Sequence, residues 1–171
     1  MLKRKELKQL CKRYFEFLYE DHGFRLEGER SDSWGYELLL TNNTVGVILT
    51  FEYREFYLFV KLCRLRDGAF PPKPGEIRPE TTLDSFDLDD IVSIMSPGTS
   101  IPPYELNTKL DLEFLEDVVK KQSDNLRRYG IDIVNGDFSI FPELDKIVKE
   151  RARKAAIQKW GDKATDLGWI I

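Results

Sequence analysis

Five acidic side chains lie close together in the middle of the chain and form its densest group of residues that could do chemistry. They are Glu80, Asp84, Asp87, Asp89 and Asp90. Their spacing does not match a calcium-binding loop, which needs alternating oxygen ligands and a glycine before a distal Glu. One interpretation is helix capping with a solubilising surface, because acids in a first turn stabilise the helix dipole. The other is a binding surface for a basic partner, which makes these five residues the candidate partner-binding site. We then expect the carboxylates of Asp84, Asp87, Asp89 and Asp90 to be largely exposed and not all engaged in internal pairs, with Leu83, Phe86 and Leu88 buried as anchors.

A second arrangement has the residue types of a nuclease-like metal site. Glu52-Tyr53-Arg54 falls at the end of a predicted strand, and Glu37 lies on the strand before it. Some nucleases place an acid and a Glu-x-Lys motif on adjacent strands, where the carboxylates hold Mg²⁺. Here Arg54 replaces the lysine, and a guanidinium does not deprotonate at neutral pH. A metal-dependent hydrolase or nuclease-like domain is therefore the alternative function, and a solvated charge pair is the simpler interpretation.

Other catalytic chemistry lacks the residues it needs. His22 is the single histidine and falls at the end of the first predicted helix, where a cation complements the helix dipole. No glycine cluster that could cradle a phosphate follows a strand. Cys11 and Cys63 each lie in an apolar pattern, which predicts buried structural thiols rather than a disulfide. We expect no catalytic residue, no metal ligand set and no cofactor.

The charge distribution favours a protein partner. Residues 1–13 and 146–163 are strongly basic and the rest of the chain is strongly acidic, although the net charge is −4. A nucleic-acid binder presents one continuous positive stripe, so the pattern argues against nucleic acid and fits a basic protein partner better. No apolar run reaches the length of a membrane span, and the N-terminus lacks a signal-peptide pattern. A cytoplasmic protein without membrane contact is expected.

Hydrophobic periodicity predicts an antiparallel sheet between two helical regions. Apolar residues recur at helical spacing over residues 3–22, and the period then changes to two. The strands expected from this alternation cover residues 24–29, 34–41, 45–53 and 56–65, with Val47, Leu49 and Phe51 facing inward. The turn signal Asn42-Asn43 and a second short connection at Arg54-Glu55 imply a meander.

The second half of the chain is predicted to be mainly helical. Residues 67–83 contain four prolines and form a long irregular segment, of the kind that is often functional. Asp87 can cap a short helix, a second loop covers 99–109, and residues 111–129 return to helical period. The last helix, 142–160, is expected to turn six residues inward: Leu144, Ile147, Val148, Ala152, Ala155 and Ala156. The apolar tail 167–171 either docks on the core or provides a surface for homo-oligomers.

One segment resembles known proteins. The stretch from Tyr129 through Asn135-Gly136-Asp137 to Phe141, followed by Glu143-Leu144 and a basic helix, resembles small uncharacterised bacterial proteins. Some of these are similar to the immunity proteins of polymorphic-toxin systems. The resemblance covers residues 124–154, carries no catalytic residue, and implies a protein that acts by binding.

These observations together predict one domain spanning residues 1–171. Its fold class is α+β: an antiparallel meander of about four strands, with an N-terminal helix and a C-terminal helical section. The expected function is a non-catalytic, immunity-like or accessory protein-binding module that presents its acidic surface to a basic partner. An enzyme is the less favoured class.

Overall fold

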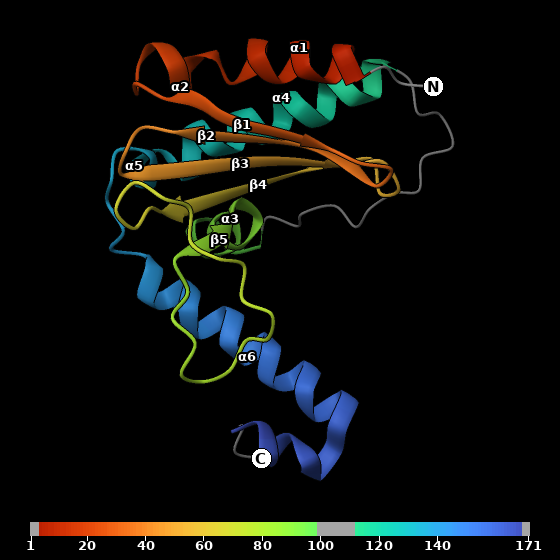
Figure 1. The fold of residues 1–171 in the computed structure, drawn as a ribbon, viewed down its shortest axis with the longest axis vertical. Helices are drawn as coiled ribbons and strands as arrows, with labels where there is room; N and C mark the ends of the chain where they lie inside the picture. The colour runs from red at the N-terminus through yellow and green to blue at the C-terminus, as the bar shows by residue number, and fades with distance from the viewer. Residues whose placement is uncertain (1–3, 99–111, 169–171) are drawn as a thin grey trace.

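The sheet is a five-stranded antiparallel meander in which every strand pairs with its neighbour in the sequence. A computed structural model describes residues 4–98 and 112–168 (Figure 1). The strands follow one another in spatial order: β1 (Arg25–Ser31), β2 (Gly35–Thr41), β3 (Val45–Glu52), β4 (Tyr57–Arg64) and β5 (Ser85–Asp87). The predicted α+β class is confirmed. So are the three antiparallel strands within residues 34–65.

The fifth strand was not expected from the sequence. β5 pairs Ser85–Asp87 with Lys61–Cys63 of β4, at a place where the acidic segment was expected to enter a helix. Three residues are too few to show a period of two, so no pattern in the sequence could identify this strand.

The helices largely follow the predicted ranges. They are α1 (Arg4–Tyr14), α2 (Glu16–Glu20), α3 (Leu88–Met95), α4 (Leu112–Tyr129), α5 (Ile131–Val134), α6 (Phe141–Trp160) and the 3₁₀ helix η1 (Gly161–Leu167). The single helix expected over residues 3–22 is interrupted at Phe15, whose backbone leaves helical geometry. This break coincides with complete burial of the Phe15 ring, and side-chain burial outweighs the loss of one helical turn.

The hydrophobic core lies between one face of the sheet and helices α1, α3 and α4. Val47, Leu49 and Phe51 point into it, as predicted. α4 covers the sheet and contributes Leu115 and Val119, and α1 packs on α4 (Figure 1). Within the described part of the chain, no helix combines the length and apolarity that crossing a bilayer requires.

The last long helix departs from its prediction. α6 runs away from the sheet (Figure 1), and only Phe141 and Leu144 near its start are buried. Ile147 and Ala155, expected to face inward, are exposed, because the body of the protein contacts only the first turns of the helix. η1 folds back on α6. The predicted loop 99–109 and the end of the apolar tail, residues 169–171, lie outside the described residues.

Candidate functional site

Two of the five predicted partner-binding acids are buried inside the protein. The Asp84 side chain is 7% exposed and accepts a hydrogen bond from Arg66 Nε at 2.6 Å. The Asp90 side chain is 12% exposed and pairs with an Arg151 guanidinium nitrogen at 2.7 Å. The expectation that these carboxylates are exposed and free of internal pairs is wrong.

The other acids of the segment also contact neighbouring elements. Asp87 occupies the N-cap position of α3 without a capping hydrogen bond. It pairs instead with Lys61 Nζ at 3.5 Å, and burial raises the pKa of its carboxyl. Asp89 accepts a hydrogen bond from the Tyr57 hydroxyl at 3.0 Å. Glu80 is exposed and lines a hollow of about 440 Å³ beside the start of α6.

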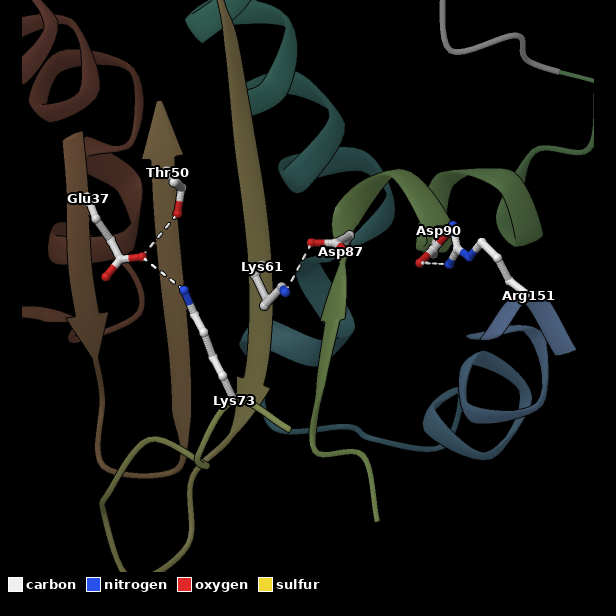
Figure 2. A network of polar contacts seen from close by, with 7 residues as sticks. All are labelled: Glu37, Thr50, Lys61, Lys73, Asp87, Asp90 and Arg151. Carbon is white, nitrogen blue, oxygen red and sulfur yellow. Dashed lines mark hydrogen bonds and ion pairs between the residues drawn. The ribbon is translucent and has the colours of Figure 1, made fainter. Parts of the chain in front are cut away.

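The segment 80–90 is therefore attached to the protein through both its apolar and its acidic side chains. Phe86 and Leu88 are buried, as expected for anchors, and Leu83 is half-buried. Figure 2 shows Asp87 directed at Lys61 on the neighbouring strand and Asp90 directed at Arg151 on α6. Most of the charge that the sequence concentrates here is used within the chain.

The basic regions at the two ends of the chain also use part of their charge in internal ion pairs. Arg151 in the basic run 146–163 pairs with Asp90. In the N-terminal region, Lys8 pairs with Glu29 at 2.5 Å and Arg13 with Glu116 at 3.1 Å. The separation of charge along the sequence is thus partly neutralised by folding.

A different surface has the features of a site: the face of the sheet that α1 and α4 leave uncovered. Strand pairing places Glu37, Thr50 and Phe59 in one row across β2, β3 and β4, and Gly35, Glu52 and Tyr57 in the next. Because alternate side chains of a strand share a face, both rows lie opposite the core. A groove of about 520 Å³ opens over the β2–β3 part of these rows.

The groove has an acidic floor and a rim that carries both signs of charge. Glu37, Thr50 and Glu52 are half-buried in the floor. Seven charged residues line the groove in all: Asp32, Glu37, Glu52 and Glu55, with Arg30, Arg54 and Lys73. The three bases are all exposed. Asp32 and Glu55 are exposed as well, so an incoming group meets both signs of charge at the edge and carboxylates at the bottom.

Glu37 is the most enclosed of these acids and is only weakly satisfied. Its side chain is 13% exposed. The Thr50 hydroxyl donates to one carboxylate oxygen at 3.3 Å, which is long for a bond between two oxygens. Lys73 Nζ and an Arg30 guanidinium nitrogen both stop at 3.7 Å. Figure 2 shows Lys73 and Thr50 converging on the same carboxylate.

Trp34 stands at the end of the groove on a fixed turn. Its side chain is 71% exposed. One carboxylate oxygen of Asp32 accepts hydrogen bonds from the backbone N–H groups of Trp34 and Gly35, at 2.7 and 2.9 Å. The N–H of Tyr53 donates to the Trp34 carbonyl at 2.9 Å. The turn therefore exposes a large aromatic side chain on a backbone that is already ordered in the free protein.

The irregular segment 66–83 covers the opposite end of this sheet face. Phe70 lies over Gly46, where a Cβ atom would come within 2.3 Å of the phenyl ring. Glycine at this position lets the ring rest on the backbone of β3. Contact at Phe70 brings Lys73, three residues later, to the groove.

Nucleophilic and metal chemistry receive little support from the described residues. Cys11 and Cys63 are free and buried, as predicted, and burial raises the pKa of each thiol to about 12. Across residues 4–98 and 112–168, no three His, Cys, Asp or Glu side chains gather closely enough to hold a metal ion. Glu52 and Arg54 both line the groove, but no ion pair joins them in that part of the chain.

Sequence reasoning identified Glu37 and Glu52 only as acids of a nuclease-like alternative. It placed Trp34 in strand alternation with Tyr36, whereas β2 begins at Gly35 and leaves Trp34 in the turn. The available signal was the alternation itself, which puts Glu37, Thr50 and Glu52 on the face opposite the core.

Comparison of the chain with models of protein families, with curated proteins and with solved structures gives no match.

Proposed function

We propose that this chain is a non-catalytic protein-binding module, and that its binding surface is the groove on the open face of the sheet. The observation that carries the proposal is Trp34, 71% exposed on a hydrogen-bonded turn beside a groove of about 520 Å³. Tryptophan is the residue most enriched in the energetic centres of protein interfaces. Because hydrogen bonds already order the backbone of the turn, little backbone entropy is left to lose on association.

The groove is suited to recognition by charge as well as by shape. Its rim of mixed charge and its acidic floor favour a partner whose contacting segment carries both signs of charge. This differs from the basic partner expected from the sequence, because the acids of segment 80–90 are engaged inside the protein. The resemblance of residues 124–154 to immunity-like proteins is consistent with action by binding. Those residues form the α4–α5–α6 connection and lie outside the groove.

The hydrolase alternative has one observation in its favour, since Glu37 and Glu52 line the same groove. A divalent ion would have to replace Lys73 and Arg30 at the Glu37 carboxylate. Isothermal titration with Mg²⁺ and Mn²⁺ distinguishes the two functions. Stoichiometric binding that Glu52→Ala abolishes would favour the hydrolase.

Site-specific photocrosslinking tests the binding proposal. A benzophenone amino acid replaces Glu55 at the groove in the full chain, expressed in the organism that encodes it. The matched control carries the same amino acid at Lys120, which is exposed on α4. We expect a discrete crosslinked protein with the groove probe and none with the control.

The crosslinked protein is then purified and titrated with the chain. Trp34→Ala should weaken binding about 30-fold, as expected for an interface hot spot. Lys120→Ala should leave the affinity unchanged. Equal crosslinking at the two positions, or full affinity after Trp34→Ala, would contradict the proposal.

A further inference from the structure

The carboxylate of Glu37 is unusual because it is enclosed without being well bonded. Its side chain is 13% exposed, and a buried carboxylate is stable only when good donors surround it. A charge-assisted bond from nitrogen to a carboxylate is normally about 2.7–2.9 Å long. The two cations beside Glu37 both stop at 3.7 Å, and its hydroxyl donor lies at 3.3 Å.

The two cations are loosely held. The side chains of Lys73 and Arg30 are 78% and 75% exposed. Lys73 also belongs to the irregular segment 66–83 rather than to the sheet. Exposed ion pairs of this kind contribute little, so either cation can leave at low cost.

A second carboxylate lies next to Glu37. Glu37 pairs across the strands with Thr50, and Glu52 lies two residues farther along β3 on the same face. Diagonal neighbours of this kind on one face of a sheet are about 7–8 Å apart. A planar guanidinium has five N–H donors and binds carboxylates through a fork, whereas an ammonium group is a compact point charge. An arginine can therefore donate hydrogen bonds to Glu37 and still direct N–H groups towards Glu52. A lysine is less suited to contact both carboxylates.

We propose that Glu37 is the anchor carboxylate of the groove and that it binds one arginine side chain of the protein partner. In the free protein, Lys73 occupies the position that the arginine takes in the complex. The inference rests on the proposed function and adds the chemistry that the partner must present. The exposed bases of the rim, Arg30, Arg54 and Lys73, stand beside the exposed acids Asp32 and Glu55, which favours an arginine flanked by residues of both signs. A continuous basic stretch would meet repulsion at that rim.

Binding of a single arginine tests the anchor without the partner. The probe is N-acetyl-arginine amide, titrated into the ¹⁵N-labelled full chain at low ionic strength and followed by amide shifts of Thr50 and Glu52. N-acetyl-citrulline amide is the matched uncharged probe. We expect saturable binding of the arginine probe with a Kd on the order of millimolar and no saturation with citrulline. Equal binding of the two probes would overturn the anchor.

Two variants with opposite expected signs complete the test. Glu37→Gln should raise the Kd for the arginine probe at least about tenfold, because a charge-assisted bond is lost. Lys73→Met should lower the Kd about threefold, because the internal competitor is gone. Arg78→Met is the matched control, since Arg78 lies in the same segment, pairs with Glu76 and does not line the groove. It should leave the Kd unchanged.

A tighter complex on removal of Lys73 is a result that a purely structural lysine would not give. Unchanged or weaker binding of the arginine probe by Lys73→Met would overturn the role of Lys73 as internal competitor. This variant tests the proposal even if Glu37→Gln does not fold. Loss of arginine binding with retained partner binding through Trp34 would remove the anchor and leave the proposed function standing. Arginine binding through Glu37 without any crosslinked partner would remove the proposed function and leave the anchor standing.

Discussion

The acidic segment 80–90 and the groove over β2–β3 carry similar charges and use them differently. In the segment, Asp84 and Asp90 are buried against Arg66 and Arg151 at hydrogen-bond distance. In the groove, the cations beside Glu37 stay at 3.7 Å and remain largely exposed. Pairs at hydrogen-bond distance contribute to the fold, whereas looser pairs beside a hollow remain available to a ligand. The density of charge in a sequence therefore does not indicate which charges a partner can reach.

The largest expected difference between the two regions concerns their aromatic residues. Phe86 in the segment is 1% exposed and packs edge-on against Phe141 at 4.7 Å. Phe86→Ala should cost about 3–5 kcal/mol of unfolding free energy, since it leaves a cavity in the core. Trp34→Ala at the groove should change stability by less than about 0.5 kcal/mol. Urea denaturation of both variants measures the contrast, and a comparable loss in Trp34→Ala would contradict it.

The second difference concerns the charges themselves. Arg66→Met leaves the Asp84 carboxylate, 7% exposed, without its cation. We expect a loss of about 2 kcal/mol, below that of a fully buried pair because Arg66 is itself half-exposed. Glu52→Gln in the groove should stay within about 0.5 kcal/mol. Thermal unfolding in parallel with Arg78→Met, a surface control, checks the comparison. Equal effects in Arg66→Met and Glu52→Gln would remove the distinction between the regions.

The attachment of segment 66–83 can be tested at Gly46. A methyl group there would collide with the Phe70 ring, so Gly46→Ala should cost about 1–3 kcal/mol through overpacking. Adding Phe70→Ala should recover part of that loss, because it removes the clashing ring. A double-mutant cycle by chemical denaturation measures the coupling. Additive losses in the double variant would show that Phe70 does not rest on Gly46.

The smallest expected effect is the pH dependence of Asp87. Burial raises the pKa of this carboxyl, so the ionised group opposes folding above its folded-state pKa. The penalty disappears as the pH falls through that value towards the ordinary range of an aspartate, where the group is protonated in both states. Asp87→Asn should therefore be slightly more stable than the parent at pH 7.

Solvent limits the size of this effect, because the Asp87 side chain is 44% exposed. The gain should stay below about 0.5 kcal/mol. Unfolding free energies of the two proteins, measured from pH 7 down to about pH 3.5, should converge at the acidic end. A parent that is more stable than Asp87→Asn at pH 7 would indicate that the Lys61 pair outweighs burial.

Local pattern was enough to determine four of the five strands and most of the helices. The alternation through Val47, Leu49 and Phe51 and the turn at Asn42-Asn43 place β2, β3 and β4 in register. Helical period over residues 111–129 matches α4 within one residue. These features depend on residues close in sequence, whose apolar periodicity and turn preferences act before any distant contact forms.

Only the tertiary structure decided which charges remain available. Arg151 reaches Asp90 across 61 positions of the sequence, and no local pattern predicts that pair. The groove likewise exists because β2, β3 and segment 66–83 meet on the face of the sheet opposite α1 and α4. Long-range contacts also broke the first helix at Phe15 and left most of α6 outside the core. Several side chains distant in sequence could pair with the same charged group. Which pair forms depends on distances between side chains that are set only when the chain folds.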